Sequence, residues 1–256
     1  MGKSLDRQDV LVRTRSGFVM RVPSLRESIG FCLYVDGEYE PENLAFILRH
    51  CPDGVFLDIG ANIGCFSVPV AKALGKTGKV IAVEASPKIV PFLKSNLENN
   101  GIGNAEIIPF AASDRDGGEV PFFEPPSRRF GMGSMAEQFG VEPVRVPTRT
   151  LDSIVRERRI SDVKVIKVDV EGYEKLVFQG AAGLLSGPQA PLLIFEFADW
   201  AETRAGFRAG EAQELLLSWG YSLWELEGLL RGNPPLSEPL RAGFRTVVAK
   251  RTGGAS

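Results

Sequence analysis

The sequence of 256 residues contains few side chains suited to metal binding or redox chemistry. It has one histidine, His50, and three cysteines, Cys32, Cys51 and Cys65. A single histidine excludes any metal site or acid–base scheme that needs two. Three widely spaced cysteines suggest neither a disulfide framework nor a zinc site. We therefore expect a reducing, cytoplasmic setting.

The sequence also lacks long apolar runs and an excess of charge of one sign. No stretch reaches the roughly 18 apolar residues of a membrane span, and residues 1–12 hold no apolar run typical of a signal peptide. Lys and Arg total 30 against 32 for Asp and Glu, giving a net charge of −2. We expect no membrane association and no extended nucleic-acid surface.

From residue 55 onward, short strands rich in branched apolar residues alternate with helical segments. This alternation predicts a mostly parallel, doubly wound α/β sheet. The expected strands are Val55–Ile59, Val80–Glu84, Ala105–Pro109, Val163–Asp169, Pro191–Phe197, Tyr221–Leu226 and Phe244–Lys250. The expected helices are Gly64–Leu74, Pro87–Asn99, Leu151–Arg158, Tyr173–Leu185 and Gly210–Trp219.

Two regions depart from this alternation. A hairpin over Val12–Val22 and a short helix ending at His50 indicate that residues 1–50 form a cap on a main domain of residues 51–251. Residues 117–147 are rich in proline and glycine and show no periodic pattern. Long loops are uncommon without a function, so we predict a lid or substrate loop, with a tolerated surface insertion as the alternative.

The most informative segment is VFLDIGANIGCFS, a buried strand followed by a loop of the form D-x-G-x-x-x-G. Gly60 lets the backbone approach a ligand, and Gly64 allows close packing where the next helix starts. Asn62 and Ser67 offer side-chain hydrogen bonds. Asp58 is poorly suited to a pyrophosphate but suits a cationic ligand such as S-adenosylmethionine. A nicotinamide-dependent oxidoreductase, which would use G-x-G-x-x-G, is the disfavoured alternative.

Polar residues also follow the next two expected strands. Glu84 can accept hydrogen bonds from both hydroxyls of a ribose, and Asp114 can accept one from the amino group of adenine. The predicted cofactor-binding residues are Asp58, Gly60, Ala61, Asn62, Gly64, Ser67, Glu84, Ala85, Ala112, Ser113, Asp114 and Asp169.

Carboxylates gather where the fourth and fifth expected strands end. Lys167 and Asp169 point to the same side of their strand, Glu171 lies in the following turn, and Glu196 lies near the end of the adjacent strand. Repulsion among three carboxylates raises a pKa or recruits a cation, either Lys167 or a divalent metal at Asp169 and Glu196. The structural alternative is that these acids cap the next helix.

We predict that this acidic group performs the chemistry, because His50 precedes the first core strand. Asp169, alone or with Glu171 and Glu196, takes the acceptor proton or binds the acceptor, and Lys167 holds the carboxylate geometry.

Several segments together resemble a known family. Over residues 38–198 the chain resembles the FkbM family of S-adenosylmethionine-dependent methyltransferases, and Gly133-Ser134 matches a small element of that family. The resemblance implies a class I methyltransferase (Rossmann-like) fold, with a seven-stranded sheet whose last strand is antiparallel. It also implies O-methylation, often of natural products or sugars. The matching segments are LDIGANIG, VEASPKIVPFLKSNLENN, AASD, TLDSIV, IKVDVEGYEKLVFQGA and IFEF.

The resemblance does not supply the acceptor, and residues 1–37 and 200–256 match less clearly. We expect a small-molecule or glycan acceptor. A nitrogen or macromolecular acceptor, a binding protein without catalysis and a homo-oligomer stay open. The pair Arg128-Arg129 either contacts an anionic or sugar acceptor or is solvated surface, and Trp200 either lines the acceptor pocket or packs in the core.

Overall fold

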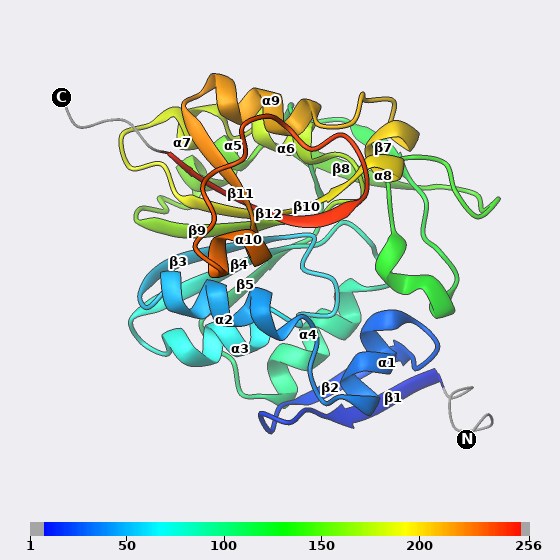
Figure 1. Cartoon of the computed structure of the whole chain (residues 1–256). Coiled ribbons are helices and arrows are strands. Elements are labelled where there is room, and N and C mark those ends of the chain that lie inside the picture. The colour runs from blue at the N-terminus through cyan, green and yellow to red at the C-terminus, as the bar shows by residue number, and fades with distance from the viewer. Residues whose placement is uncertain (1–7, 252–256) are drawn as a thin grey trace.

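The computed structural model describes residues 8–251 and has a seven-stranded sheet at its centre (Figure 1). The strand order is β11-β12-β10-β9-β3-β4-β5. β12 runs antiparallel to both of its neighbours, and the other adjacent pairs are parallel. The predicted class I methyltransferase sheet is therefore confirmed. The strands are β3 (Gly54–Ile59), β4 (Gly78–Val83), β5 (Ala105–Ile108), β9 (Val163–Val168), β10 (Leu192–Ala198), β11 (Tyr221–Glu225) and β12 (Phe244–Arg251).

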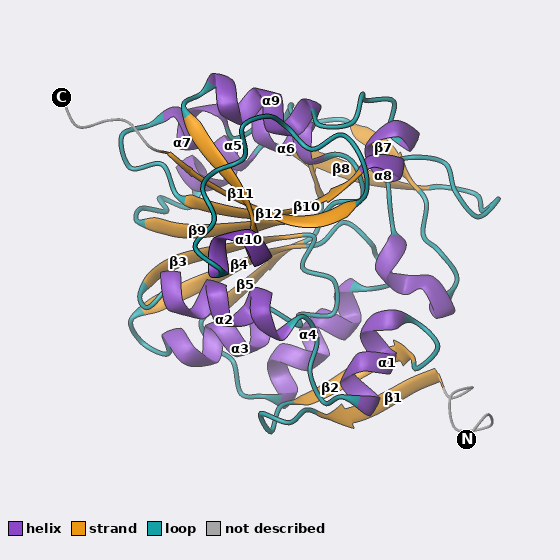
Figure 2. Cartoon of the chain, in the orientation of Figure 1, coloured by secondary structure: helices purple, strands orange, loops and turns teal. Residues whose placement is uncertain are grey.

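Helices cover both faces of the sheet (Figure 2). Successive residues of a strand point to opposite faces, so Phe56 joins one core and Leu57 the other. The first core is closed by α2 (Pro41–His50), α3 (Ser67–Leu74) and α4 (Val90–Asn99). The second is closed by α5 (Leu151–Glu157), α6 (Glu174–Gln179), α7 (Ala182–Ser186) and α9 (Glu211–Ser218).

The N-terminal hairpin of β1 (Gln8–Arg13) and β2 (Val19–Ser24) packs on α4, followed by α1 (Ser28–Val35). Asn96 of α4 is fully buried and accepts a hydrogen bond from the backbone N of Arg21 at 2.5 Å. Its amide donates to the carbonyl of Ile63 at 2.8 Å. One side chain thus joins the hairpin to the loop that follows β3. The first seven residues of the predicted cap lie outside the described residues.

Residues 117–147, whose sequence shows no periodic pattern, nevertheless contain regular structure. They contain β7 (Glu119–Phe122), the 3-10 helix η2 (Ser127–Met132) and the start of β8 (Val144–Arg149), and β8 pairs with β7 and with β6 (Ala111–Ala112). Phe122 and Val146 form a small core beneath this sheet. Pro121 and Pro147 occupy exposed strand positions. Because proline is uncommon in strands, these two residues obscure the alternation of apolar and polar residues that would have predicted β7 and β8.

The helices differ from prediction mainly in their bounds. The expected helix Tyr173–Leu185 is two helices, α6 and α7, separated near Gly180, where a Cβ atom would lie 1.9 Å from the carbonyl oxygen of Ser113. The short helices α8 (Asp199–Arg204) and α10 (Leu226–Leu230) were not predicted. Within residues 8–251, no helix combines the length and the apolar character that crossing a membrane requires.

Candidate active site

The loop after β3 passes very close to the end of β9. Gly60 has a φ of +78°, and a Cβ atom at this position would lie 1.8 Å from the carbonyl oxygen of Asp169. The backbone N atoms of Gly60 and Ala61 both donate to the carbonyl of Val83, at 3.0 and 2.9 Å. Only glycine fits here, and it places the loop beside the ends of β4 and β9.

A cavity of about 630 Å³ lies against this loop, and we call it the glycine-loop cavity. Of the predicted cofactor residues, its lining includes Gly60, Asn62, Glu84, Ala85, Ala112 and Asp169. Its apolar walls are supplied by Ile59, Val83, Phe110, Ala111, Phe122, Phe130, Met135 and Val170.

Glu84 is held in this cavity by backbone donors. Its Oε2 accepts from the N of Asn62 and its Oε1 from the N of Ser86, both at 2.8 Å. Burial raises the pKa of Glu84 to about 7, although these two hydrogen bonds oppose the shift. Each carboxylate oxygen keeps a lone pair for a further donor such as a ribose hydroxyl.

Asp58 does not line the glycine-loop cavity, where we expected it to contact a ligand. It is fully buried, and it lines neither this cavity nor the second cavity described below. The hydroxyl of Ser67 donates to its Oδ2 at 2.5 Å. Among the residues that the structure describes, its Oδ1 has no hydrogen-bond partner. Burial raises the pKa of Asp58, opposed by the charge of Lys167. Asp58 therefore lies behind the loop, where its unpaired oxygen fits a donor or a positive charge.

Five other predicted cofactor residues also lie outside the lining of the glycine-loop cavity: Ala61, Gly64, Ser67, Ser113 and Asp114. Ser113 is buried, and its hydroxyl donates to the exposed Asp114 at 3.0 Å. Gly64 is a packing position, because a Cβ atom there would lie 2.8 Å from Leu93 of α4. The expected contact of Asp114 with adenine does not follow from this placement.

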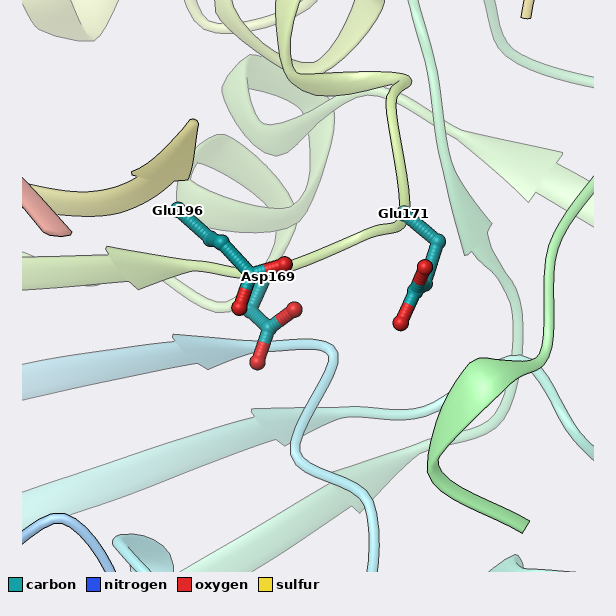
Figure 3. A group of neighbouring side chains, drawn as sticks. All are labelled: Asp169, Glu171 and Glu196. Carbon is teal, nitrogen blue, oxygen red and sulfur yellow. The ribbon is translucent and has the colours of Figure 1, made fainter. Parts of the chain in front are cut away.

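Asp169, Glu171 and Glu196 form a compact group that we call the acid cluster (Figure 3). One carboxylate oxygen from each lies within 4.8 Å of the others. In Figure 3, Asp169 and Glu196 lie beside each other at the strand ends, and Glu171 extends from the following turn. The convergence expected from the strand order is therefore present, with a spacing that would also suit a divalent cation.

Lys167 balances the charge of this cluster. Its Nζ is 3.1 Å from Oδ2 of Asp169 and lies over the ring of Phe66, 4.9 Å from the centroid. Burial alone would lower the pKa of Lys167, but Asp169 and Asp58 outweigh it and raise that pKa. Lys167 is therefore charged, and it fixes Asp169 as an oriented carboxylate.

The two glutamates of the cluster have pKa values above that of an ordinary glutamate. Burial raises the pKa of Glu171 to about 8, with Asp169 adding to the shift. Burial and the charge of Asp169 also raise the pKa of Glu196 well above its usual range. Close to neutral pH, Glu171 can therefore exchange a proton beside the carboxyl group of Asp169.

Glu171 is held by residues far from it in the sequence. Its φ is +56°, and its carbonyl accepts from the hydroxyl of Ser134 at 3.2 Å. Its Oε2 lies 3.6 Å from Nη2 of Arg204 without a hydrogen bond. Arg204 in turn lies over the ring of Trp200 at 4.8 Å. Nothing in the motifs predicted the role of Arg204.

A second cavity of about 780 Å³ opens onto the acid cluster, and we call it the acid-cluster cavity. It shares Gly60, Asn62, Gly131, Asp169 and Glu171 with the glycine-loop cavity, so the two meet at a common wall. Its other lining residues are Glu27, Ser28, Ile29, Tyr39, Ala61, Cys65, Phe66, Met132, Lys167, Glu196, Trp200 and Phe244.

Glu27 and Tyr39 line the acid-cluster cavity but were not predicted as site residues, because the residues between the hairpin and α2 carry no motif. Trp200 also lines this cavity, with 42% of its surface exposed.

Comparison with known proteins identifies the class. The model of the methyltransferase FkbM domain matches residues 58–223, more than half of the chain. The chain therefore contains a methyltransferase domain whose cofactor is S-adenosylmethionine. It belongs to the FkbM methyltransferase family, as the sequence motifs predicted.

Other similarities are partial or loose. A probable cobalt-precorrin-6B C(15)-methyltransferase (decarboxylating) of Sulfolobus acidocaldarius is 42% identical over 53 residues, which is 21% of this chain and 28% of that protein. The chain thus matches under a third of the length of that relative. The precorrin-6y C5,15-methyltransferase of Geobacter metallireducens is 15% identical, with a TM-score of 0.46 over 82% of this chain and 86% of that one. The O-methyltransferase of Bacillus cereus is also 15% identical, with a TM-score of 0.47 over 81% and 78%.

Proposed function

We propose that the protein transfers the methyl group of S-adenosylmethionine to a hydroxyl oxygen of a small molecule, such as a natural product or a sugar. The observation that carries this proposal is the acid cluster on the wall shared by the two cavities. Asp169 and Glu171 line both spaces. A methyl donor in one cavity and an acceptor in the other would meet beside these two carboxylates.

The glycine-loop cavity suits the donor. Glu84 would accept hydrogen bonds from the ribose hydroxyls, and the apolar side chains of Phe110, Phe122 and Met135 would surround the adenine. The unpaired oxygen of Asp58 provides negative potential behind the loop. When bound, S-adenosylmethionine supplies a methyl group activated by a positively charged sulfur.

The acid cluster prepares the acceptor in this proposal. Asp169, fixed by Lys167, accepts a hydrogen bond from the acceptor hydroxyl and orients its oxygen toward the methyl carbon. The new C–O bond forms as the C–S bond breaks and its electron pair passes to sulfur. The hydroxyl proton moves along its hydrogen bond to Asp169 and from there to the ionised form of Glu171, whose pKa of about 8 lets it act as the final base near neutral pH.

The methylated atom can be read directly. Incubation with S-adenosylmethionine carrying a 13C-labelled methyl group, together with a small-molecule extract, is expected to give a product whose methyl carbon resonates in the methoxy region of the 13C spectrum. A product methyl bound to carbon or nitrogen would contradict O-methylation.

A divalent metal is the other way to balance this cluster. Because Lys167 already supplies a positive charge 3.1 Å from Asp169, we expect dialysis against a chelator to leave methyl transfer unchanged. Activity that is lost on chelation and restored by added Mg²⁺ would instead assign a metal to the cluster.

A further inference from the structure

The acid-cluster cavity continues into a groove with the opposite charge. This groove has a volume of about 1060 Å³ and shares Glu27, Ser28 and Met132 with the acid-cluster cavity. We call it the arginine mouth. The rest of its lining is Arg26, Pro126, Arg128, Arg129 and Phe139.

Positive charge dominates the arginine mouth, although the whole chain has a net charge of −2. Arg26, Arg128 and Arg129 are all exposed. The acidic residue of the lining, Glu27, is buried, and its carboxylate accepts from the N of Ile29 and from the adjacent hydroxyl, both at 2.7 Å. Three arginines therefore line the groove, together with one carboxylate that is engaged at the start of α1.

The helix η2 connects the arginine mouth to the active site, because its residues line both. Arg128 and Arg129 directly precede Phe130, which is buried and lines the glycine-loop cavity. Gly131 follows and lines both cavities, and η2 contacts α1 and β2. The arginines thus lie on the short element that also walls the site of the reaction.

We infer that the acceptor carries an oxyanion group, a phosphate, sulfate or carboxylate, that binds in the arginine mouth while its hydroxyl reaches the acid cluster. Guanidinium groups bind such oxyanions with charge-assisted, often bidentate hydrogen bonds. The acid cluster repels the same group, so the two charged regions together orient the molecule. This inference rests on the proposed function, because it takes the groove to be part of the acceptor site.

Binding of simple anions tests the inference without knowledge of the acceptor. The 15N-labelled protein, saturated with adenosylhomocysteine, would be titrated with sodium phosphate and with sodium acetate at constant ionic strength held by NaCl. We expect saturable amide shifts centred on residues 26–28 and 127–132 with at least one of the two anions. Shifts absent from these segments with both anions would overturn the inference.

Variants locate the effect. The double variant Arg128→Ala/Arg129→Ala is expected to bind the anion at least about tenfold more weakly, since each lost charge-assisted hydrogen bond is worth about that factor. Arg231→Ala, an exposed arginine that follows α10 and is outside the groove lining, is the matched control and should bind like the parent protein. Equal anion binding by the double variant and the control would refute the assignment.

Failure of this inference can be distinguished from failure of the proposed function. If the proposed function fails, no product carries the labelled methyl group on oxygen, whatever the anion titration shows. If only the inference fails, methyl transfer from an extract proceeds into the fraction that a strong anion exchanger does not retain, and the double variant keeps full activity. The inference predicts transfer into the retained fraction.

Discussion

At the scale of single residues, Lys167 supplies the positive charge that pairs with Asp169 in the acid cluster. It is buried, it lies 3.1 Å from Asp169, and burial with no partner would leave it uncharged. Asp169 keeps it charged, and it keeps Asp169 oriented. Glu171 lies 3.6 Å from Nη2 of Arg204 without a hydrogen bond, and its pKa of about 8 allows its proton to move near neutral pH.

Replacing Asp169 with Asn tests its role. The amide cannot orient an acceptor hydroxyl as the ion-paired carboxylate does, so we expect kcat to fall about 10²–10⁴-fold. The Kd for adenosylhomocysteine, measured by calorimetry, should change less than about tenfold. Similar losses in binding and turnover would place Asp169 in cofactor binding alone, and unchanged turnover would refute its role in the reaction.

The pH dependence tests Glu171. A carboxyl group whose pKa is raised to about 8 is protonated below that pH and becomes a base above it. We therefore expect kcat to rise with pH and level off above about 8, and the variant Glu171→Gln to lose that rise together with about 10²-fold or more of the rate. A variant that keeps the parent profile would assign the titration to another group.

At the scale of elements, the glycine loop and β9 depend on each other. The approach of Gly60 to the carbonyl of Asp169 leaves no room for a side chain. The same approach places the glycine loop next to the acid cluster. The positions of the loop and of the cluster therefore both depend on the contact between Gly60 and the carbonyl of Asp169.

The variant Gly60→Ala tests that contact. Its Cβ atom would displace the end of β9, so we expect the free energy of unfolding to fall by about 3 kcal/mol or more and adenosylhomocysteine binding to be lost. Gly220→Ala is the matched control, because its φ of +82° is similar and nothing lies within 4 Å. It should cost only about 1 kcal/mol, from the left-handed backbone. Equal effects in both variants would show that close packing at Gly60 is unimportant.

Glu124 anchors the segment from β7 to β8 to the glycine-loop cavity. It is buried, and its Oε1 accepts from the hydroxyl of Ser86 at 2.6 Å and from the N of Lys88 at 2.9 Å. This segment supplies Phe122, Phe130 and Met135 to the cavity wall. The lid proposed for residues 117–147 is thus tied to the loop that follows β4.

Glu124→Ala is expected to loosen this segment. Losing these hydrogen bonds costs about 1–3 kcal/mol. Hydrogen exchange should therefore become faster across residues 119–138, and adenosylhomocysteine should bind more weakly. Lys94→Ala removes an exposed lysine of α4 and should leave both unchanged. Exchange rates that match those of the parent would mean that the segment is held by its core packing alone.

The elements also show what the sequence can predict. The central strands were predictable because residues such as Phe56 and Leu57 are buried on opposite faces, and the acid cluster because strand ends meet at one sheet edge. β7 and β8 were not, because exposed prolines mask their pattern. The orientation of Asp58 toward Ser67 and the approach of Arg204 to Glu171 depend on side-chain packing between distant segments, which a local pattern does not encode.

At the scale of the whole molecule, buried acids make stability depend on pH. Burial raises the pKa of Glu84 and Glu174 to about 7, and that of Glu171 to about 8, from a value of 4.5. Their protonated forms favour the folded state, so this stabilisation is complete below about pH 4.5 and is lost as the pH rises through about 7 to 8.

We therefore expect the free energy of unfolding, measured by chemical denaturation, to be lower at pH 8 than at pH 6 by about 5 kcal/mol. The variant Glu174→Gln should reduce this difference, because the amide still accepts from the N of Val170 but no longer titrates. Equal or greater stability at pH 8 would show that these carboxyl groups are ionised at little cost in the folded protein.

The central claim is that the cavity beside the glycine loop holds S-adenosylmethionine next to the acid cluster. Titration of the protein with adenosylhomocysteine in a calorimeter tests this claim most directly. The account predicts saturable binding of one molecule per chain, which Gly60→Ala abolishes and Asp169→Asn largely preserves. No heat of association with the parent protein at several temperatures, or equal binding by Gly60→Ala, would contradict it.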